Sequence, residues 1–412
     1  MRKIMASIDI GTDSIKLVVG EMFRNKLSIL ASLYEPVQGM EDGLIINENE
    51  FKECLKTAIS KADDIIGIPI KQVIITVPPR DLEFSVITGE IEVTNNKHIV
   101  TGSDISRVFK EALRGQIKEG REYINLLPTS FSTSDGKKVR DPKGLESETL
   151  SARGILITAP QSNIYPILET LERLGVEVLD ISLTAIGDYY EYKINEMKDN
   201  SGIIINIGHE KTEVSLFNKG ILTNTESLNV GAKNIENDLM YIYKIDAKTA
   251  RDIKENLGLA YSKNAKEENS IEVIDKYNDR IIVNQLEVSK IIQSRIEEIL
   301  NLCKNQINIL TKKEISYIII TGGLTECRDF RLILNKIFKD KVIVGRVSEL
   351  GVRHNRYGAA VGLIKYYNEK SRLKDKDYSI YSIEEQQALG GYDLDEEDND
   401  SSIVKLFRNF FG

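Results

Sequence analysis

Short apolar runs separated by glycine turns give the start of the chain a pattern that later returns. Residues 4–30 predict strand, turn, strand, turn and strand, with the core SIDIGTDSIKLVV at 7–19. The same order recurs 197 residues further on, in GIIINIGHEKTEVSLF at 202–217. A tight turn with glycine, hydroxyl residues and an acid can present backbone N–H groups to a phosphate. Two such hairpins could grip a polyphosphate from both sides, although two ordinary hairpins in unrelated domains would show the same pattern.

A third apolar run, at 317–324, ends in the paired glycines Gly322 and Gly323 and precedes a helical pattern at 329–338. Glycines there allow a flat ring to approach the backbone. The order of two hairpins and a strand with paired glycines resembles the actin, Hsp70 and hexokinase ATPase group. That resemblance implies an α/β protein with the actin-like ATPase fold, in which two duplicated halves close on ATP. Residues 182–194 and 355–367 then predict the two helices that link the halves.

The last twelve residues, 401–412, predict an amphipathic helix. Its apolar residues fall within an arc of about 160°, and they are Ile403, Val404, Leu406, Phe407, Phe410 and Phe411. Lys405 and Arg408 lie on the other side, and an acidic run at 393–400 precedes the helix. Basic residues opposite three phenylalanines favour a helix lying in a membrane interface, since spanning a bilayer takes about 20 apolar residues. Docking in a partner's groove or on the protein's own core remain alternatives.

Composition narrows the class further. A chain of 412 residues predicts about two to four domains. The net charge of −8 makes nucleic acid an improbable partner. Three cysteines and three histidines, all scattered, argue against disulfides or a zinc site and suit the cytoplasm. The apolar run after the first residues is too short for a secretory signal, so we expect the membrane to be reached from the cytoplasmic side.

The stretch after the first hairpin narrows the resemblance to one family. It reads Arg-Glu-x-Ile-x-x-x-Pro at 121–128 and Asp-Pro-x-Gly at 141–144. Both motifs resemble FtsA, the bacterial cell-division actin homologue, and the resemblance extends over essentially the whole chain. It implies subdomain 1A at 1–82 and 166–198 with the linking helix 355–370, 1C at 83–165, 2A at 199–233 and 311–354, 2B at 234–310, a flexible acidic linker at 371–400 and a membrane-targeting helix at 401–412.

The resemblance also implies a function. FtsA carries ATP and Mg²⁺ between its halves, polymerises on the cytoplasmic face of the cell membrane at the division site, receives the C-terminal tail of FtsZ on subdomain 2B, and links that ring to later division proteins partly through 1C. Within 2B, residues 263–279 predict a loop and 285–310 a long helix whose apolar stripe belongs mostly to the core. Arg295 on its polar face is the candidate contact for the FtsZ tail. A pilus-type actin-like platform and a soluble small-molecule kinase of the same fold are the alternatives.

The resemblance assigns the nucleotide-binding positions. Asp9 would hold Mg²⁺ through water. The residues implied to contact ATP are Asp9, Gly11, Thr12, Asp13, Ser14 and Lys16 in the first hairpin, Gly208, Lys211, Thr212 and Gly231 in the second half, and Lys254, Gly322 and Gly323 on the nucleoside side.

The second hairpin departs from the family pattern of Asp-Ile-Gly-Gly-Gly-Thr-Thr-Asp. Asn206 replaces an acid, and an amide cannot act as a base. His209 replaces a glycine, and Glu210 adds a negative charge that Lys211 can compensate. Arg251 stands where the ribose-binding pattern, three residues before Lys254, has an acid. We therefore expect ATP binding with weak or no hydrolysis, and we assign no catalytic residue.

Overall fold

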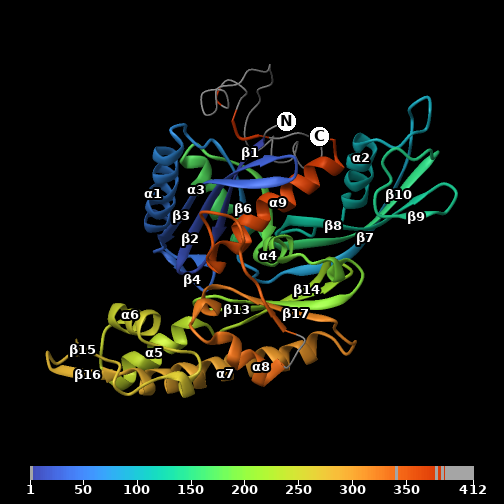
Figure 1. Cartoon of the computed structure of the whole chain (residues 1–412). Coiled ribbons are helices and arrows are strands. Elements are labelled where there is room, and N and C mark those ends of the chain that lie inside the picture. The colour runs from blue at the N-terminus through green and yellow to red at the C-terminus, as the bar shows by residue number, and fades with distance from the viewer. Residues whose placement is uncertain (1–2, 339–341, 376–378, 382–384, 386–412) are drawn as a thin grey trace.

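The computed structural model describes residues 3–338, 342–375, 379–381 and 385. The first half, above the second in Figure 1, is built on a five-stranded sheet. Three antiparallel strands form a meander, and two more strands extend the sheet in parallel from the first of them. In spatial order the strands are β3 (Lys26–Pro36), β2 (Ser14–Phe23), β1 (Lys3–Ile10), β6 (Gln72–Val77) and β11 (Glu177–Leu183).

The second half repeats this topology strand for strand. Another antiparallel meander is again extended in parallel from its first strand. The internal duplication expected from the sequence is therefore confirmed. In spatial order the strands are β14 (Ile221–Leu228), β13 (Thr212–Asn218), β12 (Ser201–Ile207), β17 (Tyr317–Thr321) and β18 (Val342–Val344).

Each half carries an insertion at a different point of the repeat. Between β6 and β11 the chain forms an antiparallel sheet with one helix packed on it, which projects to one side in Figure 1. Its elements are β7 (Glu83–Glu92), α2 (Gly102–Leu113), β8 (Arg121–Thr133), β9 (Lys138–Val139) and β10 (Thr149–Pro160). Its exact limits, like those of the other subdomains, remain a prediction.

Between β14 and β17 the chain forms a helical insertion. The long helix expected at 285–310 is present, but the loop expected at 263–279 was a wrong prediction, because part of it pairs in a two-stranded hairpin. The first hairpin strand is mostly exposed and lies within a polar segment, which concealed it. The elements are α5 (Ala232–Tyr243), α6 (Ala247–Asn256), η2 (Ser262–Asn264), β15 (Ser270–Ile274), β16 (Arg280–Asn284) and α7 (Gln285–Leu310).

Two helices join the halves, as the sequence predicts. They are α4 (Thr184–Tyr192) and α9 (Gly358–Leu373), the latter entered through a 3₁₀ turn at Asn355–Tyr357. The helices cross with almost no space between their backbones: a Cβ placed on Gly362 would lie 1.8 Å from the carbonyl oxygen of Gly187. Only glycine fits at this crossing. The joint between the halves is therefore formed by two helices in direct backbone contact.

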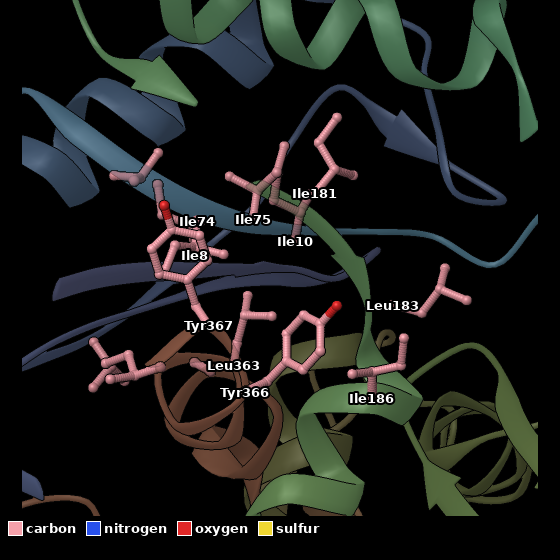
Figure 2. Packing of buried hydrophobic residues seen from close by; sticks show 14 of the residues in the cluster. Ile8, Ile10, Ile74, Ile75, Ile181, Leu183, Ile186, Leu363, Tyr366 and Tyr367 are labelled. Carbon is pink, nitrogen blue, oxygen red and sulfur yellow. The ribbon is translucent and has the colours of Figure 1, made fainter. Parts of the chain in front are cut away.

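Helix α9 also anchors the core of the first half. Figure 2 shows Leu363 and Tyr367 of α9 lying beside Ile8 of β1 and Ile74 of β6, all of them buried. On the same helix, Lys370 donates to both carboxylate oxygens of Asp180 on β11, at 2.8 and 3.0 Å. The helix is thus fixed by apolar packing and by a largely buried ion pair.

The remaining described elements are short strands, helices and 3₁₀ helices. They are β4 (Met40–Glu41), β5 (Leu44–Ile45), α1 (Glu48–Ile66), α3 (Gln161–Arg173), η1 (Asn195–Lys198), η3 (Gly323–Glu326) and α8 (Phe330–Phe338). The predicted amphipathic helix at 401–412 and the acidic run before it lie outside the described residues. Among the described helices, none has the length and apolarity needed to cross a bilayer.

Candidate nucleotide site

A cavity of about 380 Å³ lies between the two halves, and both predicted hairpins contribute to its wall. Of the candidate nucleotide-binding residues, eleven line it, and Asn206 lines it as well. The eleven are Asp9, Gly11, Thr12, Asp13, Ser14, Lys16, Gly208, Lys211, Lys254, Gly322 and Gly323. The structure therefore brings together residues that are more than 300 positions apart in the chain.

The first hairpin forms a compact polar turn. The N–H of Gly11 donates to the carbonyl of Ser14 at 3.0 Å, and the Ser14 hydroxyl donates to Asp13 at 3.0 Å. Lys16 lies directly opposite Asp9, with its ammonium 3.6 Å from the Asp9 carboxylate. Burial by itself would raise the pKa of Asp13, but Lys16, His209 and the Ser14 hydrogen bond outweigh it and hold that pKa below its usual value. A lysine and a small polar turn at the cavity wall suit a phosphate group.

The second hairpin has the same turn with different chemistry. The N–H of Gly208 donates to the carbonyl of Lys211 at 2.9 Å, as Gly11 does to Ser14. The position opposite Asn206, where the first hairpin has its lysine, is held by Glu213. Burial and then the charge of Asp9 raise the pKa of Glu213 to about 8. The duplicated hairpins thus present a lysine on one side of the cleft and an acid on the other.

A buried acid behind Asn206 has no counterpart in the motifs found in the sequence. The Asn206 amide donates to Asp188 of α4 at 2.6 Å, and Asp188 is completely buried. Burial raises the pKa of Asp188 well above its usual value, despite the hydrogen bond from Asn206. The signal available in the sequence was an acid in the middle of a largely apolar and aromatic helix, Thr184–Tyr192.

The side chain of His209, which replaces a glycine of the family pattern, points toward α5 and α6. Its Nε2 lies 3.1 Å from the carboxylate of Glu236 on α5 and 2.9 Å from the guanidinium of Arg251 on α6. Lys254 donates to the same carboxylate at 2.5 Å. Burial alone would raise the pKa of Glu236, but hydrogen bonds from His209 and Lys254 bring it to about 2. An acid therefore lies beside Arg251 and Lys254 on another helix, which the sequence analysis did not find.

Charged residues also connect the halves at the cavity wall. Lys211, predicted to contact phosphate, donates to Asp42 of the first half at 2.5 Å, and Arg80 donates to the same carboxylate at 2.7 Å. Glu210 is paired with Lys233 at 2.6 Å. The added negative charge at Glu210 is thus compensated by Lys233, not by Lys211 as the sequence indicated.

Two of the candidate nucleotide-binding residues, Thr212 and Gly231, do not line the cavity. Arg295, the candidate contact for the FtsZ tail, lies away from it. The hydroxyl of Thr212, which is fully buried, donates to the carbonyl of Val230 at 2.7 Å. Gly231 caps α5 where a Cβ would lie 2.4 Å from the His209 carbonyl. Both residues lie next to the second turn without lining the cavity, and their contact with nucleotide stays a prediction. Arg295 lies on α7 and donates from two nitrogens to Asp238, each at 2.8 Å.

The donor set fits a nucleoside polyphosphate with a divalent cation. Lysines at 16 and 254, two glycine turns and an open glycine at 323 line one cavity. The Asp9 carboxylate, held by the Thr76 hydroxyl at 2.8 Å, offers the hard oxygen that Mg²⁺ prefers. When bound, the divalent cation would neutralise negative charge on the phosphates.

Comparison with solved structures identifies the class. The chain aligns with MreB5 of Spiroplasma citri bound to ADP at a TM-score of 0.54 and 14% identity, over 90% of this chain and 98% of that one. It aligns with the chain of a PilM–PilN type IV pilus biogenesis complex at 0.59 and 13%, over 87% and 97%. These similarities concern the fold alone. With the duplicated halves, they define a protein of the actin-like ATPase fold.

Comparison with sequences identifies the family. The model described as "Cell division protein FtsA" matches residues 203–362, and the one described as "SHS2 domain inserted in FTSA" matches 80–158. The cell division protein FtsA of Bacillus subtilis is 25% identical over 385 residues, covering 93% of this chain and 88% of that protein. FtsA of Streptococcus pneumoniae is 26% identical over 368 residues, covering 89% and 80%. The chain belongs to the FtsA family of cell-division proteins.

Proposed function

We propose that the chain is a membrane-tethered division protein that binds ATP with Mg²⁺, polymerises, anchors the FtsZ ring to the cytoplasmic face of the cell membrane and recruits later division proteins. The observation that supports nucleotide binding is the shared cavity, in which Lys16, Lys254 and two glycine turns converge from both halves. Family membership supports the division role.

Hydrolysis should be slow or absent. Asn206 of the second hairpin faces the first hairpin across the cavity. Its side-chain amide cannot accept a proton as a general base. Burial raises the pKa of both nearby acids, Asp188 and Glu213, and favours their protonated forms, which cannot accept a proton. The expected behaviour is a nucleotide that stabilises the closed halves without rapid turnover.

Calorimetry with Mg²⁺-ATP tests this site. Lys16→Ala should weaken ATP binding at least tenfold, because it removes the ammonium beside the first turn. Lys56→Ala, which removes a lysine exposed on α1, is the matched control and should bind as the wild type does. Absence of ATP binding by the wild-type protein, or phosphate release at about 10 per second, would contradict the proposal.

The FtsZ contact is proposed for the polar face of α7. Arg295 is engaged by Asp238 and by Glu298, at 2.8 and 2.6 Å, and its side chain is 25% exposed. A peptide that copies the FtsZ C-terminal tail must compete with these acids for the guanidinium. Arg295→Glu should therefore weaken the peptide, whereas Asp238→Asn, which removes the competitor, should preserve or tighten binding. Equal affinity of all three proteins would exclude Arg295 from the contact.

Membrane attachment is proposed for residues 401–412. Six apolar side chains could contribute roughly 9–18 kcal/mol if fully buried. An interfacial helix buries them only in part, and ordering costs about 1–2 kcal/mol per residue in backbone entropy. One copy should therefore bind reversibly, and firm attachment should need many helices on one filament.

Two substitutions of equal charge test the orientation of that helix. Phe407→Glu places an acid in the centre of the apolar arc and should abolish binding to anionic vesicles. Asn409→Glu adds the same charge on the polar face and should reduce binding only slightly, through repulsion. If the two variants bind equally well, the helix does not lie in the interface as proposed.

A further inference from the structure

The short hairpin of β4 and β5 carries an acid at its tip, on the edge of the first half that faces the second (Figure 1). Its two turn residues, Asp42 and Gly43, have φ values of 53° and 83°. Asp-Gly is a favoured pair for a type I′ turn, because both central residues of that turn need positive φ. A Cβ on Gly43 would lie 2.9 Å from the Cβ of Pro78, so the turn rests against the loop after β6. The hairpin therefore holds Asp42 at the boundary between the halves.

The carboxylate of Asp42 binds two cations, one through each oxygen. The ammonium of Lys211, in the second phosphate turn, lies 2.5 Å from Oδ1 and also donates to the Asp42 carbonyl at 3.2 Å. Arg80, in the loop after β6, donates to Oδ2 at 2.7 Å and to the same carbonyl at 3.2 Å. The hydrogen bond from Lys211 holds the pKa of Asp42 below its usual value, so the carboxylate is ionised at neutral pH. One anion thus neutralises two cations that come from different halves.

Both cations also line the nucleotide cavity. Lys211 is a candidate phosphate contact, whereas the sequence did not single out Arg80. Other acids lie near them, but Asp42 is the nearest ionised partner of each. Asp81 is 3.5 Å from Arg80 and mostly exposed, and Glu213, whose charge would act on Lys211, has its pKa raised to about 8 by burial. Carboxylate and phosphate oxygens accept the same hydrogen bonds from an ammonium and a guanidinium, so Asp42 engages the donors that an arriving phosphate would use.

We propose that Arg80 binds a phosphate group of the nucleotide together with Lys211, and that Asp42 holds both cations in the empty cleft until that phosphate displaces it. The contact of Asp42 with the two cations is called the latch below. This inference rests on the nucleotide binding proposed above, since the polyphosphate is the group that takes over the cations. A phosphate carries more negative charge than a carboxylate and has more acceptor oxygens, so it can compete for both donors.

The latch joins the two halves before nucleotide is bound, because Asp42 and Arg80 belong to the first half and Lys211 to the second. Opening it therefore uses part of the free energy of ATP binding. The three side chains are partly exposed, and an exposed ion pair typically changes an equilibrium constant by about two- to fivefold. Removing the Asp42 charge should tighten ATP binding by a factor of this size. By linkage, it should destabilise the nucleotide-free protein by the same factor.

Calorimetry of the full chain with Mg²⁺-ATP tests the latch. Asp42→Asn preserves the turn, since Asn-Gly also favours type I′, and it should tighten ATP binding about threefold. Glu41→Gln removes the same charge from the neighbouring exposed position of the hairpin, and this control should bind ATP as the wild type does. Arg80→Gln should weaken ATP binding about fivefold or more, because it removes a guanidinium from the phosphate.

Urea unfolding supplies a second measurement. Without nucleotide, Asp42→Asn should unfold at a lower urea concentration than the wild type, and with saturating Mg²⁺-ATP the two should unfold together, because ATP has already opened the latch. Unchanged or weaker ATP binding by Asp42→Asn would overturn the latch, as would equal tightening in Glu41→Gln, which would indicate the general negative field. Unchanged binding by Arg80→Gln would exclude Arg80 from the phosphate. These results leave ATP binding by the wild type intact, whereas its absence would contradict the proposed function and the latch together.

Discussion

Gly362→Ala should destabilise the protein at the joint between its halves. The added Cβ would lie 1.8 Å from the Gly187 carbonyl oxygen, 2.6 Å from its carbonyl carbon and 2.8 Å from the Glu191 nitrogen. All three atoms are backbone, so no side chain can rotate away, and α4 and α9 must separate by about 1.5 Å to restore normal contact. Overpacking of this kind costs about 3 kcal/mol, the upper end of its usual range.

The cost can be measured by thermal unfolding. With an unfolding entropy of about 2.1 cal/mol/K per residue, a chain of 412 residues that unfolded as one unit would lose about 3–4 °C of Tm. Gly323→Ala is the control, because a Cβ there meets nothing within 4 Å, and it should change stability by less than about 0.5 kcal/mol. Unchanged stability of Gly362→Ala would refute the close crossing and the rigid joint inferred from it.

Further substitutions test the acids of the cleft and the ion pair between Lys370 and Asp180. Asn206→Asp should raise any residual ATP turnover, since it introduces a carboxylate at the cleft, and an unchanged rate would remove residue 206 from the chemistry. Glu213 has a folded pKa of about 8, above its value of 4.5 when unfolded, so stability should fall as the pH rises through this interval. Glu213→Gln should flatten that dependence in urea unfolding, and identical pH profiles would contradict the assignment. Lys370→Met should cost about 3 kcal/mol by leaving Asp180 buried without its lysine, and adding Asp180→Leu should recover most of that loss.

The sequence predicts the parts of the fold that depend on local pattern. Alternating apolar residues and glycine turns place both hairpins, and apolar spacing places α7. The hairpin of β15 and β16 was missed because its first strand is short and mostly exposed, and because polar residues flank it on both sides. A strand whose side chains face solvent on both sides has no periodic signal to detect.

The candidate site also has a part that the sequence predicts and a part that it does not. Residues next to a turn, such as Gly11 and Gly208, are placed by the motif that contains them. Asp188 and Glu236 belong to helices outside those motifs, and only the folded chain brings them to Asn206 and His209. Contacts of this kind depend on tertiary packing, so the sequence indicates a missing acid without showing where its replacement lies.

Co-sedimentation with anionic lipid vesicles, run with and without Mg²⁺-ATP, measures nucleotide binding, assembly and membrane attachment together. The full chain should pellet with vesicles, and more so with nucleotide, because assembly multiplies the number of terminal helices on one particle. A chain that lacks residues 401–412 should stay in the supernatant with vesicles while still binding ATP. Equal sedimentation of the shortened and full chains with vesicles would contradict the membrane anchor, and sedimentation indifferent to nucleotide would contradict its coupling to ATP-dependent assembly.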